Sequence, residues 1–302
     1  MRPGKYPTNN QALALRIGRI EITLISDGLI WLDGGGTFGL VPRARWEKIM
    51  PPDESNRVPL SLNCLLIQCQ GKTILVDTGL GNHLTDRQRQ DFGLDRDRGG
   101  LTQALARVGV VPEEVDIVIN THLHADHCGG NTTFRDGSEE LAPTFSNAEY
   151  WIQRLEWADA TFPNERTRAA YLTQNFLPLE KTGQIRLLNG DTRVSGEVRT
   201  VITRGHTRAH QSVVIESEGE TMLYTGDLAT LAIHFERLAW VTAYDVEPLE
   251  TIETKRRWQN WVLERDALVI FPHDTRTPVA HLRKDDEGSM QIEPITPVPT
   301  EQ

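Results

Sequence analysis

Three histidines and one aspartate lie within six consecutive residues of this chain, in the segment THLHADH (121–127). The apolar run EEVDIVIN (113–120) precedes them and predicts a short buried strand. Gly129 and Gly130 follow, where the chain has to turn. A single histidine is usually a hydrogen-bonded surface or core residue. Four metal-capable side chains at one strand end instead predict a metal site. The fold of this chain therefore has to bring these side chains together.

The spacing within this segment predicts how the side chains divide. In an extended segment, side chains two residues apart point to the same side, so we expect His122 and His124 to bind one ion together. Asp126 and His127 lie past the bend and are predicted to hold a second ion. Imidazole and carboxylate ligands suit zinc, and also iron or manganese.

Charge and cysteine content narrow the function classes. The formal net charge is −10, which disfavours a nucleic acid as the substrate. The three cysteines, Cys64, Cys69 and Cys128, are odd in number and form no CxxC pair. They indicate a reducing compartment rather than a disulfide framework. No stretch has the apolar length of a signal peptide or a membrane span, so we expect a cytoplasmic protein that does not bind membranes.

Strand-like and helix-like segments alternate along the chain. Apolar periodicity and turn residues predict strands in 17–28, 61–79, 183–227 and 267–271, and helices in 99–110, 147–160, 165–180 and 251–266. Ser146 and Glu149 resemble a capping box for the helix 147–160. With no linker or repeat, residues 1–302 are predicted to be a single α/β domain, in which two sheets have helices on their outer faces. Residues 1–16 and 285–302 are expected to be loosely ordered.

Four further motifs accompany THLHADH along the chain: VDTG (76–79), RGHTRAH (204–210), LYTGD (223–227) and VIFPHD (269–274). In this order, the five motifs resemble those of the metallo-β-lactamase superfamily, and the resemblance extends from about residue 17 to residue 280. It implies a four-layer αββα sandwich.

The resemblance also implies a dinuclear metal site. One ion would be held by His122, His124 and His206, the other by Asp126, His127 and His273, with Asp227 bridging the two. Asp77 would support the metal loop from behind. His210 would be a packing or hydrogen-bonding residue rather than a ligand.

The chemistry implied by this site is metal-dependent hydrolysis of an ester-type bond. Two divalent ions, zinc in the first place and iron, manganese or cobalt as alternatives, would hold a hydroxide that attacks a small-molecule substrate. Asp126 and Asp227 are the acidic residues of this catalytic centre. No serine or cysteine nucleophile is then needed, and Cys128 is expected to be a small buried residue.

The sequence departs from the pattern of the superfamily's lactonases at two places. Arg208-Ala209 replaces the usual Pro-Gly, and Thr230 stands where those lactonases carry a tyrosine three residues after the bridging aspartate. The segment 226–245 is more similar to organophosphate-hydrolase-like members. Lactones, aryl esters and phosphotriesters are therefore all candidate substrates. The candidate substrate pocket, with ordinary core aromatics as the alternative, consists of Thr230, His234, Phe235, Trp240 and Tyr244.

Other members of the superfamily remain as alternatives. A thioester hydrolase of the glyoxalase II type would need a basic patch, for which Arg276, Arg283 and Lys284 are candidates. A mononuclear iron dioxygenase uses a similar first motif. The resemblance further suggests a homodimer, because related lactonases and organophosphate hydrolases are often dimers.

Overall fold

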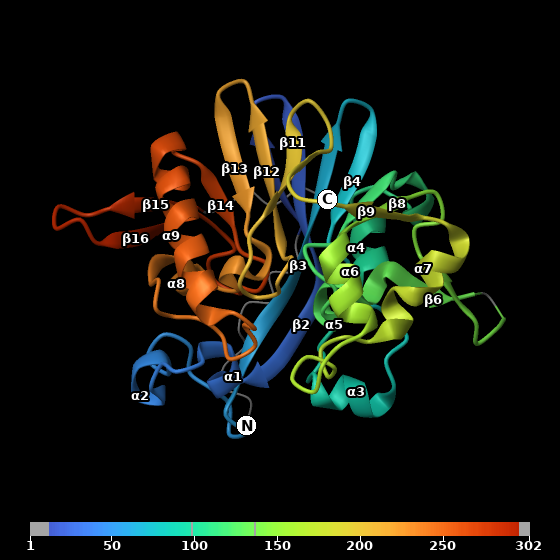
Figure 1. Ribbon diagram of the computed structural model, residues 1–302, viewed down its shortest axis with the longest axis horizontal. Helices are drawn as coiled ribbons and strands as arrows, with labels where there is room; N and C mark the ends of the chain where they lie inside the picture. Colours follow the sequence, from blue (N-terminus) through green and yellow to red (C-terminus); the bar gives the residue numbers. More distant parts are fainter. Residues whose placement is uncertain (1–11, 98, 136, 296–302) are drawn as a thin grey trace.

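Two seven-stranded sheets face each other at the centre of the molecule, and helices cover their outer faces (Figure 1). This computed structural model describes residues 12–97, 99–135 and 137–295. Helices α4, α6 and α7 lie outside the first sheet, and α8 and α9 lie outside the second (Figure 1). The four layers confirm the predicted αββα sandwich.

The first sheet has the strand order β1-β2-β3-β4-β5-β8-β9. Its strands are β1 (Leu13–Ile17), β2 (Ile20–Asp33), β3 (Arg57–Cys69), β4 (Lys72–Val76), β5 (Ile117–Ile119), β8 (Glu149–Gln153) and β9 (Ile185–Leu188). The second sheet runs in sequence order from β10 to β16. Its strands are β10 (Thr192–Arg193), β11 (Val198–Ile202), β12 (Gln211–Ser217), β13 (Glu220–Tyr224), β14 (Leu268–Ile270), β15 (Val279–Lys284) and β16 (Met290–Pro294). A small hairpin of β6 (Thr132–Phe134) and β7 (Leu141–Pro143) stands apart.

The helices are short except for the last one. They are α1 (Gly34–Phe38), α2 (Arg43–Trp46), α3 (Asp86–Asp91), α4 (Leu101–Arg107), α5 (Ala125–Cys128), α6 (Arg154–Thr161), α7 (Leu177–Thr182), α8 (Ala232–Glu236) and α9 (Pro248–Arg265). Short 3-10 turns occupy η1 (Pro112–Glu114), η2 (Gly129–Asn131), η3 (Thr173–Asn175) and η4 (Gly226–Ala229). No helix in the described part of the chain is long and apolar enough to cross a membrane.

Burial on both faces explains why the central strands are almost continuously apolar. In β3, Leu65 and Ile67 pack between the two sheets, while Cys64 and Leu66 pack against the helices on the outer side. The inter-sheet core also takes Ile215 and residues from β13 and β14 of the second sheet. A sheet with both faces covered has no exposed face for polar residues, so strict alternation disappears.

Two helix predictions are wrong. Residues Glu149–Gln153 form strand β8, so the helix expected over 147–160 begins only at Arg154, and Ser146 and Glu149 form no capping box there. The apolar run YWIQ pairs with both β5 and β9, and this sheet pairing outweighs its helical spacing. The helix expected over 165–180 is reduced to η3 and α7, because residues 165–170 form turns.

The chain ends are better ordered than predicted where the structure describes them. Leu13–Ile17 pairs with β2, and Met290–Pro294 pairs with β15. The expectation of loose ends is therefore wrong for these two strands. Residues 1–11 and 296–302 lie outside the described residues.

One arrangement of strands places the functional site. Strands β4 and β5 are parallel neighbours in the first sheet, and β13 and β14 are parallel neighbours in the second. Strand β5 ends just before the motif THLHADH, and each of the other three ends within the first residues of a motif. Their carboxyl ends meet at one edge of the sandwich, where the hydrogen bond from Gln211 N to Thr121 O (2.9 Å) joins the two sheets.

Candidate metal centre

The first three candidate ligands come together from two sheets. His122 and His124 follow β5, and His206 lies in the loop before β12. Their ligand atoms lie within 4.8 Å of one another, and His206 Nε2 is 3.0 Å from His124 Nδ1. All three side chains are buried. We call these residues the first trio.

The second trio consists of Asp126, His127 and His273. Asp126 and His127 belong to the single turn α5, and His273 follows β14. The two imidazoles meet at 2.9 Å between their Nε2 atoms. Asp126 Oδ2 lies 3.7 Å from His273 Nε2 and 3.9 Å from His127 Nε2.

Asp227 lies between the two trios. Its Oδ2 is 3.2 Å from His206 Nε2 in the first trio. Its Oδ1 is 3.2 Å from His273 Nε2 and 3.4 Å from His127 Nε2 in the second. One carboxylate therefore faces both groups of imidazoles, which is the arrangement that a bridging ligand requires.

Hydrogen bonds at the outer ring nitrogens fix the orientation of three imidazoles. The Nδ1 atom of His127 lies 2.9 Å from Asp77 Oδ2, and that of His206 lies 2.9 Å from Asp245 Oδ1. The Nδ1 atom of His273 lies 2.6 Å from the backbone oxygen of Ser61. These oxygens only accept hydrogen bonds, so each Nδ1 carries the proton and each Nε2 directs a lone pair inward.

This donor set fits metal ions. The inward lone pairs of His127 and His273 would repel each other at 2.9 Å unless a cation lies beside them. In addition, His122 Nε2 and Asp227 Oδ1 are buried and have no hydrogen-bond partner. Buried polar atoms without partners are costly, and coordination to a cation would satisfy both.

The charges act differently on the individual imidazoles. Burial of His127 is outweighed by the charges of Asp227 and Asp77, which raise its pKa well above the usual value. Burial of His206 is outweighed by Asp227 and Asp245, which raise its pKa. Burial lowers the pKa of both His122 and His124 well below its usual value, and the neighbouring imidazoles add to the effect. Burial opposes the charge of Asp227, but His127, His273 and His206 outweigh it and hold the pKa of this carboxyl well below its usual value. A metal ion binds the neutral imidazole and the ionised carboxylate, so metal binding releases any proton held by His127 and His206.

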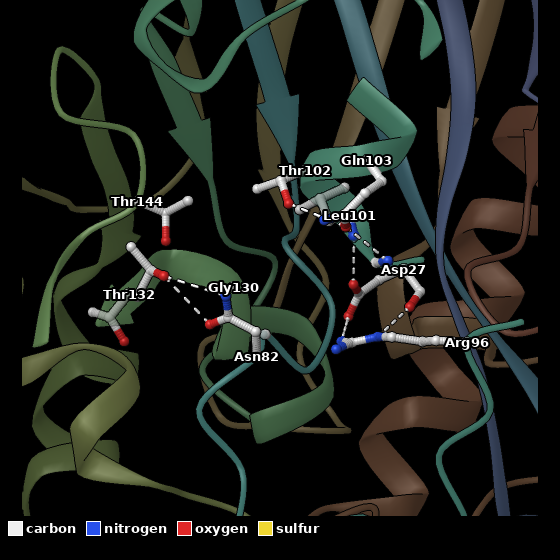
Figure 2. Close-up of a pocket in the computed structure, with 12 residues that line it drawn as sticks. Asp27, Asn82, Arg96, Leu101, Thr102, Gln103, Gly130, Thr132 and Thr144 are labelled. Carbon is white, nitrogen blue, oxygen red and sulfur yellow. Dashed lines mark hydrogen bonds and ion pairs between the residues drawn. The ribbon is translucent and has the colours of Figure 1, made fainter. Parts of the chain in front are cut away.

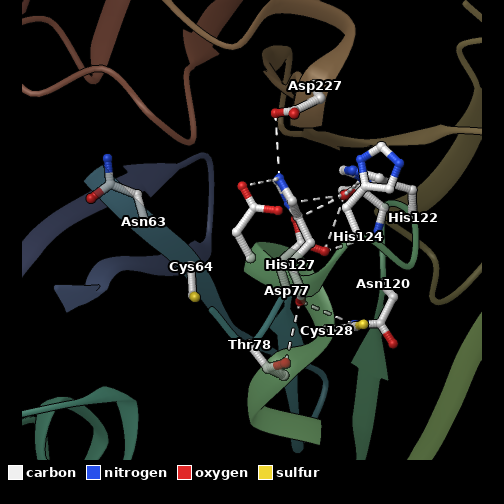
Figure 3. Close-up of polar contacts among 12 residues, drawn as sticks. Asn63, Cys64, Asp77, Thr78, Asn120, His122, His124, His127, Cys128 and Asp227 are labelled. Atoms are coloured by element: carbon white, nitrogen blue, oxygen red, sulfur yellow. Dashed lines mark hydrogen bonds and ion pairs between the residues drawn. The ribbon is translucent and has the colours of Figure 1, made fainter. Parts of the chain in front are cut away.

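Asp77 supports the loop from behind, as Figure 3 shows, with the His127 imidazole between Asp77 and Asp227. Besides His127, the Asp77 carboxylate accepts hydrogen bonds from Thr121 N (2.8 Å) and Thr121 Oγ1 (2.9 Å). Asp77 itself has a positive φ of 58°. This uncommon backbone conformation turns its side chain back toward the loop that carries the histidines.

His210 lies behind Asp227 and belongs to none of the groups whose atoms gather for an ion. Its Nε2 accepts a hydrogen bond from Asp227 N (2.9 Å), and its Nδ1 lies 2.8 Å from Thr203 Oγ1. Gly226 approaches the ring so closely that a Cβ there would lie 2.6 Å from His210 Nε2. His210 therefore holds the backbone that carries Asp227.

The five residues of the candidate substrate pocket do not line one common pocket. Phe235 is fully buried and packs with Phe271 in the core outside the second sheet, so the prediction is wrong for Phe235. Trp240 and His234 are buried against Phe38. Phe235, Trp240 and His234 are therefore core residues, as in the alternative interpretation, because α8 and its following loop fill the space under α9. Thr230 is buried with no partner for its hydroxyl, whereas Tyr244 is 44% exposed.

A hollow lined by Asp27, Arg96, Thr144 and other residues lies elsewhere and includes no candidate ligand (Figure 2). The buried Asp27 carboxylate accepts hydrogen bonds from Leu80 N (2.8 Å) and Leu101 N (2.7 Å) and pairs with Arg96. It thus fixes the turn that follows Asp77. Asp27, at the end of the strand expected over 17–28, is therefore a structural support.

Sequence reasoning also missed Asp245, which is buried and holds His206. It lies inside the segment 226–245 but belongs to none of the five motifs. Only the fold brings it to His206, through the hydrogen bond from Val246 N to His206 O (3.1 Å).

Comparisons with known proteins agree with the geometry. Residues 57–281 match the model of the Metallo-beta-lactamase superfamily. An N-acyl homoserine lactonase of Bacillus cereus is 29% identical over 231 residues, which cover 72% of this chain and 83% of the lactonase.

Solved structures share the fold. A probable metal-dependent hydrolase from Staphylococcus aureus has a TM-score of 0.83 and 28% identity, and the match covers 94% of this chain and all of the hydrolase (100%). The dizinc quorum-quenching lactonase AidC has a TM-score of 0.77 at 18% identity, over 95% of this chain and 99% of AidC.

Proposed function

Because this chain belongs to the metallo-beta-lactamase superfamily, we propose that it is a metal-dependent hydrolase of ester-type bonds in small neutral molecules, with lactones as the first candidate. The observation that carries the proposal is the position of Asp227, which faces His206 on one side and both His127 and His273 on the other. A purely structural metal site has no need for a carboxylate shared between two groups of ligands.

In this proposal, the first trio and Asp227 hold one divalent ion, and the second trio and Asp227 hold the other. Zinc suits the imidazole and carboxylate donors, and iron, manganese or cobalt would be accepted by the same atoms. When bound, such a pair of ions lowers the pKa of a shared water and polarises the substrate carbonyl.

The residues of the chain supply the positioning. Asp227 sets the separation of the two groups of imidazoles, while Asp77, Asp245 and Ser61 keep three rings turned inward. The Asp126 side chain is 19% exposed, whereas those of His127 and His273 are 2% exposed. We therefore propose that substrate approaches from the side of Asp126.

Tyr244 is the candidate for contact with substrate on that side. Burial, followed by the charges of Asp126 and Asp33, raises the pKa of its phenol to about 12. The hydroxyl therefore keeps its proton at neutral pH and can donate a hydrogen bond. Tyr244 would supply the phenol that the sequence lacks at Thr230.

Two alternatives have less support. Of the basic residues that a glutathione thioester would need, Arg283 is already paired with Asp266 and Glu293. A mononuclear iron dioxygenase leaves the second trio and the shared position of Asp227 unexplained.

We further propose that the chain is a single domain, because both sheets contribute to one inter-sheet core. A cytoplasmic location would fit its three free cysteines. A homodimer would cover some of the exposed apolar side chains, among which Leu40, Phe162 and Leu249 are the most exposed. Light scattering on the purified protein tests the dimer.

The experiment that tests the function compares kcat/KM for a lactone, an aryl ester, a phosphotriester, a glutathione thioester and a β-lactam. We expect metal-dependent turnover of the first three, with the lactone preferred. The Asp227→Asn variant serves as the control for contaminating activity. A clear preference for the glutathione thioester or the β-lactam would contradict the proposed substrate class while leaving the metal assignment intact.

A further inference from the structure

Glu156 is a buried carboxylate outside the set of candidate ligands. It lies in the first turn of α6 and is 1% exposed. Its Oε1 accepts hydrogen bonds from Leu123 N (2.9 Å) and Tyr171 Oη (3.1 Å), and its Oε2 accepts one from Thr207 Oγ1 (2.6 Å). Three donors therefore converge on one carboxylate in the interior.

Each partner of Glu156 adjoins a member of the first trio. Leu123 stands between His122 and His124 in the chain, and Thr207 directly follows His206. The Tyr171 ring packs against His124, with 5.0 Å between the ring centroids. None of these three hydrogen bonds reaches a residue of the second trio.

The segments that Glu156 joins come from different sheets. The segment with Leu123 follows β5 of the first sheet, whereas Thr207 lies in the loop before β12 of the second. Both backbone polar groups of Leu123 are hydrogen-bonded. Its N–H donates to Glu156, and its carbonyl accepts a hydrogen bond from Cys128 Sγ (3.2 Å). Glu156 therefore connects a fixed peptide in one loop to the residue after His206 in the other.

We propose that Glu156 is a positioning residue for the first metal position. Its carboxylate holds the two loops together, so that His124 and His206 keep their 3.0 Å approach before an ion binds. Ligands that are already in place lose less conformational freedom on binding, which strengthens the affinity. This inference rests on the proposed assignment of the first trio as metal ligands.

The test uses Glu156→Gln, which keeps the side-chain shape. The new amide retains one oxygen for Leu123 N, but its NH₂ group cannot accept a hydrogen bond from Thr207 Oγ1, and the negative charge between the loops is lost. The two successive zinc dissociation constants are measured by competition with a chelator, together with the melting temperature of the metal-free protein. His206→Ala identifies which of the two steps belongs to the first trio.

We expect Glu156→Gln to raise the zinc dissociation constant of the first trio by about tenfold or more and to leave the other dissociation constant unchanged. The matched control is Asp159→Asn, one turn further along α6, where the carboxylate pairs with the half-exposed Arg208. This variant should leave both steps unchanged. Thr207→Val removes only the hydrogen bond to Glu156 Oε2 and should reproduce part of the loss of zinc affinity.

Two results would overturn the role of Glu156. One is a folded Glu156→Gln variant with both dissociation constants at the wild-type values. The other is an equal loss in both steps together with a lower melting temperature of the metal-free protein, which would indicate a structural role alone. If the wild-type protein shows no second step, or His206→Ala changes neither step, the metal assignment itself fails.

Discussion

Asp245→Asn separates the charge behind His206 from the hydrogen bond that orients it. Asp245 is 2% exposed, and its Oδ1 accepts hydrogen bonds from both His206 Nδ1 (2.9 Å) and Thr242 Oγ1 (2.8 Å). An asparagine carbonyl can take the place of Oδ1 and accept both bonds. The substitution therefore removes the negative charge and leaves the geometry in place.

The expected magnitude follows from this difference. A hydrogen bond to a charged group contributes about 1.5–3 kcal/mol, and a neutral one about 0.5–1.5 kcal/mol. The loss of about 1–1.5 kcal/mol corresponds to about a tenfold weaker affinity for the first ion. Asp245→Ala also removes the hydrogen bond that orients the His206 ring. Its loss of affinity for the first ion should approach a hundredfold, about the upper end for such supporting residues.

The assay is the stepwise chelator competition on metal-free protein. Thr242→Val is the matched control, because it removes the second donor to the same oxygen and keeps the charge. It should leave the affinity for the first ion nearly unchanged. If Asp245→Asn binds the first ion as tightly as the wild-type protein, or binds both ions more weakly by the same factor, the charge of Asp245 does not act through His206.

Two further predictions concern neighbouring residues. His206→Ala should lose the first ion. His210→Ala should bind it more weakly but retain it, because the two ring nitrogens of His210 are taken up by Asp227 N (2.9 Å) and Thr203 Oγ1 (2.8 Å) rather than by an ion. Metal content after dialysis distinguishes the two variants, and the reverse order would show that the ligand assignment in this motif is wrong. Cys128→Ala should keep its kcat, because Cys128 is fully buried and burial raises the pKa of its thiol; a loss of activity by orders of magnitude in a folded variant would indicate a chemical role for the thiol.

The sequence predicted the clustered side chains well because each lies just after a strand end. THLHADH follows β5, Asp227 follows β13 and His273 follows β14. Each short motif therefore marks the end of a strand, and the parallel strand pairs bring these ends together. The structure places all seven candidate ligands within one cluster.

The supporting residues could not be predicted in the same way. Asp245 and Glu156 contact segments 39 and 33 residues away in the chain, respectively, and only the fold determines these pairings. Strand β8 was mistaken for a helix because a short apolar run fits both periods. For Phe235 the sequence leaves both the pocket and the core open, because it gives no means to distinguish an aromatic side chain beside the site from one in the core behind it.

The dinuclear centre is tested most directly by the metal content of wild-type protein and of Asp227→Asn, measured by elemental analysis after saturation with zinc and removal of free metal. We expect close to two ions per wild-type chain, from the two trios that share Asp227. Asp227→Asn should have a lower content, with hydrolysis reduced by orders of magnitude. A single ion per wild-type chain that added zinc, manganese or cobalt does not increase would contradict the dinuclear centre.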